Sequence, residues 1–213
     1  MPILTKLTPT KQGRMALFFD GEFTFSVDLE TLTKEALIKG KEFSTEELRQ
    51  LWKETEYQKA KERAFRLLGF KSYTRKMLIQ RLEREEFSPE TAECVLDRLE
   101  ELGLIDDLDY AVRCSRDLVH LKKYSRSRVR QELRSRGVEE ADIEEALEQL
   151  EPDDPCSQIE LVLRKKYWKG LSEEKGRRRA VNGLMRLGYS FGDIRQVIND
   201  LSDQWSDVAD SEE

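Results

Sequence analysis

The sequence predicts a mainly α-helical protein, in which three tandem three-helix repeats of about 51 residues form a curved, elongated array behind a small N-terminal β-hairpin and helix. Leucines and arginines both recur at this period of 51 residues: Leu82, Leu133 and Leu184; Arg75, Arg126 and Arg177. A constant period indicates one supersecondary unit used three times. Stacked units of this kind present an extended surface, so we expect binding of a long partner.

The chain begins with strand character. The pair Asp20–Gly21 lies between two runs of apolar residues, which is typical of a two-residue turn in a β-hairpin. After the turn, Phe23, Phe25 and Val27 alternate with polar residues, which predicts that all three lie on the core face. A third short strand is expected near residues 3–7.

Two helices follow in the expected order. Asp28 is a candidate N-cap for a short helix that ends at Gly40. Ser44 and Glu47 have the spacing of a capping box, which predicts a second helix that continues to Leu68.

The repeats share their helix-start signals. Thr74, Ser125 and Gly176 lie 51 residues apart and suit an N-cap, so the repeated arginine would be the first helical residue of each middle helix. Apolar residues at i, i+3, i+4 and i+7 predict a third helix after it. The first helices of the repeats are expected at residues 57–68, 107–121 and 155–169. The predicted divisions are an extension (1–56), the repeats (57–106, 107–154 and 155–201) and a frayed acidic tail (202–213).

Composition favours a soluble cytoplasmic protein without a cofactor. The net charge is -6, and no apolar run is long enough to cross a membrane. The three cysteines form no CxxC pair, and His120 is the one histidine, so neither a disulfide framework nor a metal site is expected.

The charges separate by helix. Residues 122–136 carry seven basic residues against Glu132 alone, whereas the next helix carries only acids. The third repeat has a run of arginines at 177–179. Stacked middle helices would therefore form a basic ridge that attracts phosphates or an acidic protein. The alternative is that these charges only solvate helix faces.

The repeated arginines have two interpretations. A residue present in every copy is typical of an architectural role, such as pairing with the acidic helix of its own or the next unit. The non-repeated Arg128, Arg130, Arg178 and Arg179 are better candidates for partner contact, because the fold does not require them.

Signals of catalysis are missing from the sequence. It contains no phosphate-binding loop, no GxSxG and no HExxH motif. Asp106 and Asp107 more readily cap a helix than hold a metal. Basic residues flank three aromatic residues in the sequence, Tyr124, Tyr167 and Trp168. These aromatic side chains would either stack on nucleotides or pack at helix junctions.

Three segments resemble the RecX family of bacterial recombination regulators. Residues 103–107 read GLIDD and are followed by Tyr110 and Ala111, which is similar to the family signature. The segments 82–87 and 132–138 match two further family patterns, although Glu85–Glu86 replaces the usual Lys-Gly and Met77 replaces a frequent glutamate. Tandem three-helix repeats are also the architecture of that family.

The resemblance implies a non-enzymatic, monomeric modulator of the RecA recombinase. Such proteins lie in the groove of the RecA–single-stranded DNA filament, inhibit ATP hydrolysis and strand exchange, and promote disassembly. The expected partner- or DNA-binding residues are Lys122, Lys123, Arg126, Arg128, Arg130, Arg134, Arg177, Arg178 and Arg179. The expected structural positions are Arg75, Leu82, Leu133, Leu184, Asp106, Asp107 and Tyr110.

Two other functions remain open at this point. One is an autonomous nucleic-acid-binding module, which would bind bare single strands with a steep salt dependence. The other is a helical-repeat scaffold for an unrelated protein, whose binding would be indifferent to salt and to recombinase.

Overall fold

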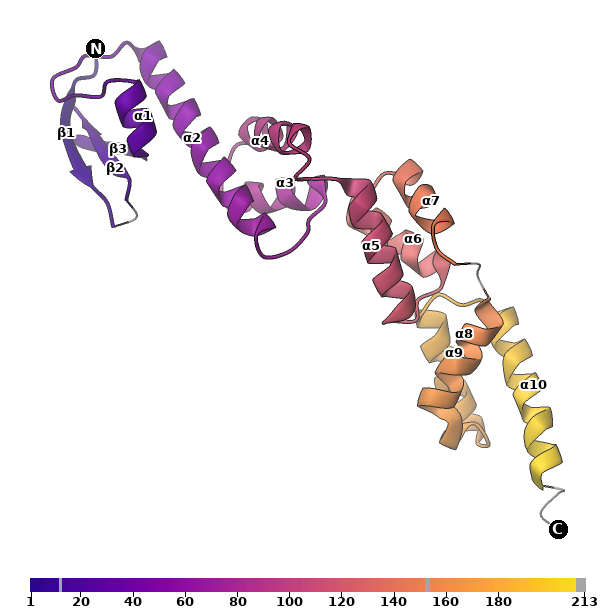
Figure 1. Cartoon of the computed structure of the whole chain (residues 1–213). Helices are drawn as coiled ribbons and strands as arrows, with labels where there is room; N and C mark the ends of the chain where they lie inside the picture. Colours follow the sequence, from indigo (N-terminus) through magenta and orange to yellow (C-terminus); the bar gives the residue numbers. More distant parts are fainter. Residues whose placement is uncertain (12, 152–153, 210–213) are drawn as a thin grey trace. The chain divides into compact units, whose positions relative to one another are not determined.

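The computed structural model describes residues 1–11, 13–151 and 154–209, and it divides into two compact units, Met1–Ile105 and Asp106–Glu213. The first unit holds a three-stranded sheet and helices α1 to α4, and the second holds α5 to α10 (Figure 1). The prediction of a mainly helical protein with a small N-terminal β element is confirmed.

The N-terminal sheet is antiparallel in the order β1-β2-β3, with β1 Leu4–Pro9, β2 Met15–Phe19 and β3 Glu22–Val27. Asp20 and Gly21 form the β2–β3 turn with φ angles of 50° and 93°, so both the expected hairpin and the expected third strand are present. One face of the sheet packs on the helices behind it. The buried core there comprises Leu4, Leu17, Phe19, Phe25, Val27, Leu37, Phe43 and Leu51.

The expected inward position of Phe23 is wrong. Leu17 pairs with Phe25 and Phe18 pairs with Phe23, so Thr24 is an extra residue in β3. This bulge moves Phe23 to the outer face of the sheet, where it is 60% exposed. Simple alternation could not reveal it, because one inserted residue reverses the face of every residue before it.

Helix α1 (Leu29–Lys34) begins at the predicted cap, where Asp28 accepts a hydrogen bond from the Thr31 amide at 2.7 Å. It ends well before Gly40, the predicted end. The chain turns at Ala36, with a φ of 46°, so that Leu37 can enter the core beneath the sheet.

Helix α2 (Thr45–Leu68) has the predicted capping box between Ser44 and Glu47 and ends at the predicted residue. It is one continuous helix, so the expected division between residues 56 and 57 lies inside it. Helices α3 (Arg75–Glu83) and α4 (Pro89–Glu101) pack against its second half.

The second unit contains the next two repeats. Its first three helices are α5 (Asp107–His120), α6 (Arg126–Ser135) and α7 (Glu140–Glu148). The last repeat begins with α8 (Pro155–Val162), which continues as a π-helical turn, Leu163–Tyr167, and a 3-10 turn, Trp168–Gly170. It ends with α9 (Glu174–Arg186) and α10 (Phe191–Ala209).

Two expectations for the last repeat are wrong. Gly176 is not the cap of α9, which begins at Glu174 after Glu173; Gly176 instead lies against Gly170, whose carbonyl oxygen would be 1.8 Å from an added Cβ. The glycine therefore permits close packing, and Arg177 is the fourth helical residue. Helix α10 also continues to Ala209, past the expected start of a frayed tail at 202, while 210–213 lie outside the described residues.

The two repeats of the second unit meet where α9 ends and α6 begins. The Ser125 amide donates to the Leu187 carbonyl at 2.9 Å, and the Tyr189 hydroxyl donates to the Lys123 carbonyl at 3.0 Å. Gly188, with a φ of +92°, lies directly against Ser125 and Arg128. Across the described ranges, no helix combines the length and apolarity that a membrane crossing requires.

Candidate nucleic-acid interface

Two arginines of α6 are paired with acids of the same unit. Arg130 lies 2.5 Å from Glu144, and Arg134 lies 2.7 Å from Glu140, both on α7. The side chains of these pairs are 36–60% exposed, so each pair contributes little to stability and salt weakens it further. A partner that contacts Arg130 or Arg134 would nevertheless have to compete with a carboxylate already in place.

Arg136 ties α6 to α5. Its guanidinium donates to Glu132 at 2.7 Å and to the buried Tyr110 hydroxyl at 2.7 Å. The hydrogen bond from Arg136 holds the pKa of Glu132 below its usual value. Burial raises the pKa of Tyr110, although the bond from Arg136 opposes the rise.

The three repeated arginines have three different sets of partners. Arg75, the first residue of α3, lies among the α4 carboxylates Glu93, Asp97 and Glu100. Burial lowers its pKa, but the hydrogen bonds to Asp97 and Glu93 and the charge of Glu100 outweigh this and raise it.

Arg126 and Arg177 bind backbone carbonyls instead. Arg126, the first residue of α6, donates to the Leu147 carbonyl at 3.1 Å and the Glu151 carbonyl at 2.7 Å, beside the C-terminal end of α7. Arg177 donates to the Leu171 carbonyl at 2.8 Å. Arg126 and Arg177, both expected at the partner surface, thus already make contacts within their own repeats.

The last repeat lacks counterparts of the α4 acids that bind Arg75. The residues 102 positions after Glu93, Asp97 and Glu100 are Arg195, Asn199 and Ser202, which offer no carboxylate.

The start of α6 forms a small cationic and aromatic cluster. The Arg128 guanidinium lies 5.6 Å and the Lys122 ammonium 5.8 Å from the centre of the Tyr124 ring. The Arg128 Nε is buried without a hydrogen-bond partner among the described residues. The neighbouring Lys123 has a φ of 58°, and its carbonyl accepts the bond from Tyr189. Tyr124 therefore packs against basic side chains at the junction of the two repeats.

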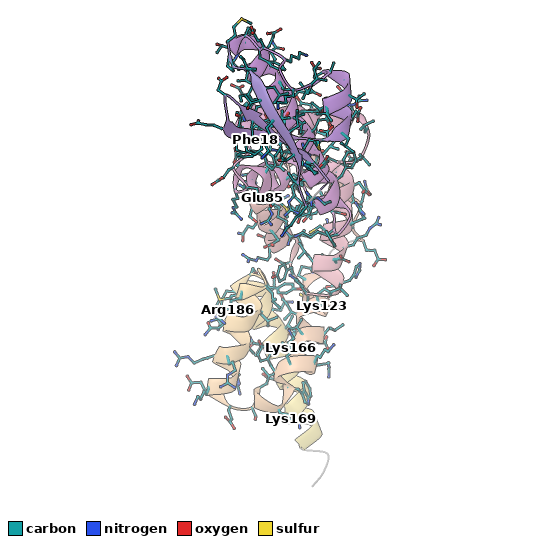
Figure 2. All side chains as sticks on the ribbon, turned by 90° about the vertical axis from the view of Figure 1, so that its left-hand side faces the viewer. Phe18, Glu85, Lys123, Lys166, Lys169 and Arg186 are labelled. Atoms are coloured by element: carbon teal, nitrogen blue, oxygen red, sulfur yellow. The ribbon has the colours of Figure 1, made fainter. Side chains whose placement is uncertain are left out.

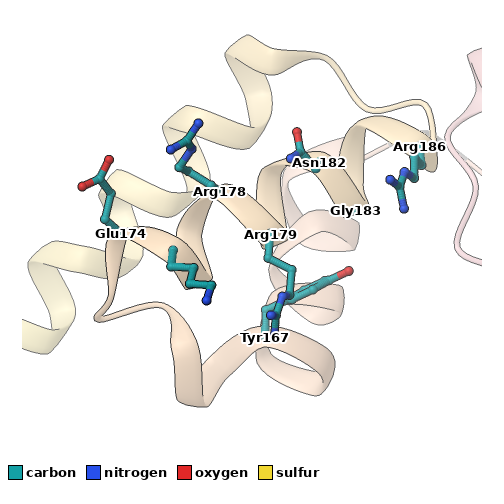
Figure 3. Close-up of a pocket in the computed structure, with 8 residues that line it drawn as sticks. Tyr167, Glu174, Arg178, Arg179, Asn182, Gly183 and Arg186 are labelled. Carbon is teal, nitrogen blue, oxygen red and sulfur yellow. The ribbon is translucent and has the colours of Figure 1, made fainter.

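An open groove of about 750 Å³ lies along α9, and most of its charged residues are basic (Figure 3). Arg178, Arg179, Lys175 and Arg186 line it, with Glu174 as the one lining acid. In the part of the chain that the structure describes, none of these four bases forms an ion pair. The groove is therefore a surface where cations are not already neutralised by nearby carboxylates.

Tyr167 forms one wall of this groove and depends on a glycine opposite. The π-helical turn ends at Tyr167, whose hydroxyl would lie 2.1 Å from a Cβ added to Gly183 of α9. Figure 3 shows Arg179 extending from α9 on the side of Tyr167. An aromatic side chain beside unpaired arginines suits a ligand that carries both a ring and a phosphate.

Lys175 and Arg186 were not among the expected site residues. Their helical spacing with Arg179 and Asn182, at 175, 179, 182 and 186, places them on one face of α9 and was available in the sequence. The sequence does not reveal which basic residues form ion pairs, because the acidic partners lie on another helix.

The expected structural positions lie inside the repeats. Leu82, Leu133 and Leu184 are fully buried, one in the core of each repeat. Asp106 caps α5 by accepting from the Asp109 amide at 2.8 Å, and Asp107 is the first residue of that helix. No group of side chains suited to hold a metal occurs among the described residues.

Two family models match this chain: "RecX, first three-helix domain" over residues 60–99 and "RecX, second three-helix domain" over residues 106–147. The regulatory protein RecX of Staphylococcus epidermidis is 30% identical over 207 residues, which cover 94% of this chain and 76% of the relative. That of Caldanaerobacter subterraneus subsp. tengcongensis is 30% identical over 189 residues, covering 89% and 94%. A crystal structure of regulatory protein RecX shares the fold, with a TM-score of 0.66, 24% identity and coverage of 93% of this chain and 100% of the other.

Proposed function

Because this chain belongs to the RecX family of regulatory proteins, we propose that it modulates homologous recombination and DNA repair in the cytoplasm without catalysis of its own. It binds, as a monomer, in the groove of the RecA–single-stranded DNA filament and inhibits ATP hydrolysis and strand exchange. Tandem helical repeats as a class suit a long filament better than a small ligand.

The observation that supports this proposal most is the concentration of unpaired cations on α9. The protein has a net charge of -6, yet four bases gather in one groove. Planar guanidinium groups bind phosphate oxygens through two parallel hydrogen bonds, which favours arginine at a DNA contact. Repulsion between DNA and the acidic parts of the surface would favour contact at such basic regions.

The pattern of ion pairs ranks the candidate contacts. Arg178, Arg179 and Arg186 can meet phosphate without losing an ion pair, whereas Arg130 and Arg134 must first leave Glu144 and Glu140. We therefore place the main contact on α9 and a secondary one on α6.

Hydrolysis of ATP by recombinase on single-stranded DNA tests the proposal. The wild-type chain should suppress hydrolysis, and the triple variant Arg178→Glu, Arg179→Glu, Arg186→Glu should suppress it about tenfold less at equal concentration, since several phosphate contacts become repulsive. Arg195→Glu is a matched control, because Arg195 is an exposed arginine on α10 outside the groove. This control should inhibit like the wild type.

Full inhibition by a correctly folded triple variant would refute the role of α9. Failure of the wild type to affect the filament would refute the function itself. In that case, tight binding to bare single strands that weakens steeply with salt would support an autonomous nucleic-acid-binding module.

A further inference from the structure

The outer face of the N-terminal sheet carries one row of side chains that crosses all three strands. Lys6 of β1 pairs with Phe18 of β2, and Phe18 pairs with Phe23 of β3. The two rings meet edge to face, with centroids 5.8 Å apart and planes at 67°, and the Lys6 ammonium lies 5.3 Å from the Phe18 ring centre. Figure 2 views the molecule from the side of the sheet and labels Phe18.

Two bulges place this row on the outer face. Thr24 is the extra residue of β3, and Thr5 is the extra residue of β1, between Leu4 and Lys6. The Thr5 hydroxyl donates to the Phe18 carbonyl at 2.9 Å and accepts from the Gly21 amide at 3.0 Å, which fixes the bulge. Without the bulge at Thr24, alternation would put Phe23 in the core with Phe25. The fold thus exposes an aromatic ring that it has the means to bury.

We propose that Lys6, Phe18 and Phe23 form a stacking platform for unpaired bases of single-stranded nucleic acid, separate from the α9 groove. Aromatic rings on adjacent strands of a sheet can stack on nucleic-acid bases, and a neighbouring lysine can bind a backbone phosphate through its ammonium group. The proposal rests on the proposed function only in that the filament would supply the strand.

The surroundings favour a nucleic acid over a protein at this face. The next row of the sheet carries only short side chains, Thr8, Ala16 and Ser26. Two rings with such neighbours are far too small an apolar area for a stable protein interface, which buries roughly 800 Å² on each partner. Lys6 lies at the β1 end of the row, where it would attract a phosphate.

The test uses the full chain and two fluorescent probes of equal length, an oligothymidine of about 15 nucleotides and an abasic oligonucleotide with the same phosphates. The wild type should bind the oligothymidine more tightly than the abasic strand. Phe23→Ala should weaken oligothymidine binding about fivefold to a hundredfold and leave abasic binding unchanged. Phe23 is exposed, so this change should preserve the fold, which circular dichroism verifies.

Phe70→Ala is the matched control, because Phe70 is an 87%-exposed phenylalanine of the same unit outside the row. It should bind both probes like the wild type. Equal oligothymidine binding by Phe23→Ala and the wild type would overturn the proposal. The proposal would also be overturned if Phe23→Ala weakened binding only when recombinase is present, because the outer face of the sheet would then contact protein. The α9 triple variant should bind both oligonucleotides more weakly and by the same factor. This pattern distinguishes a loss of phosphate contacts in the groove from a loss of base stacking on the platform.

Discussion

The arginine that recurs every 51 residues keeps its place in each repeat but changes its partners. Arg75 meets three carboxylates, whereas Arg126 and Arg177 meet backbone carbonyls. The period shows that the position matters, but it does not show what the side chain binds. Acids at the facing positions do not alone decide the partner, because Glu144, Glu148 and Glu151 stand 51 residues after the three partners of Arg75, yet Arg126 binds backbone carbonyls.

Arg126→Lys should destabilise the second unit by about 1–2 kcal/mol, because an ammonium cannot reach the Leu147 and Glu151 carbonyls with the fork of a guanidinium. Arg134→Lys, which alters an exposed ion pair, should change stability by less than about 0.5 kcal/mol. Urea unfolding of the two variants measures the difference. Equal stabilities would show that the carbonyl contacts of Arg126 contribute nothing.

Glu132 should make stability depend on acid. Its pKa is held below the ordinary 4.5 by Arg136, so its contribution is complete above pH 4.5 and disappears as the pH falls through the lowered value. The Glu132→Gln variant should therefore have a lower free energy of unfolding than the wild type at pH 7. The difference between the two should decrease as the pH falls below 4.5. Glu148→Gln, at an exposed acid of α7, serves as the control in the same unfolding series. A gap that stays constant down to pH 3 would contradict this assignment.

At the scale of elements, local signals in the sequence predict where helices begin better than which residues face the core. Ser44, Thr74 and Ser125 cap the helices that they were expected to cap. Gly176 and Phe23 deviate for one reason: each position is decided by a contact outside its own helix or strand, Gly170 in one case and the paired strand β2 in the other. The bases of α9 could be predicted from spacing, but their lack of ion pairs depends on tertiary packing.

Gly188→Ala should disrupt the junction of the last two repeats. The residue has a positive φ, and an added Cβ would lie 2.5 Å from both the Arg128 Cβ and the Ser125 Oγ. We expect a loss of about 2–4 kcal/mol from backbone strain and overpacking together. Gly192→Ala meets only an ordinary contact at 3.7 Å and should be neutral or slightly stabilising. Thermal unfolding compares them, and similar melting temperatures would mean that the junction tolerates a side chain.

At the scale of the whole molecule, charge is segregated within an acidic chain. Basic residues of α6 pair with acids of α7 in the same repeat. Among the described residues, no ion pair links α9 to α10, which has Arg195 and Asn199 where α7 has Glu144 and Glu148. Arg130 and Arg134 are thus ion-paired within their own repeat, whereas Arg178, Arg179 and Arg186 form no ion pair among the described residues. The curvature of the array, expected from the repeats, remains a prediction.

Binding to a preassembled recombinase–DNA filament by two matched variants tests this division most directly. Arg178→Gln with Arg179→Gln removes two arginines of α9 that form no ion pair among the described residues. Arg130→Gln with Arg134→Gln removes two arginines of α6 that are ion-paired. The α9 variant should bind about tenfold more weakly than the wild type and the α6 variant less than about threefold. Equal losses, or a larger loss for the α6 variant, would contradict the account.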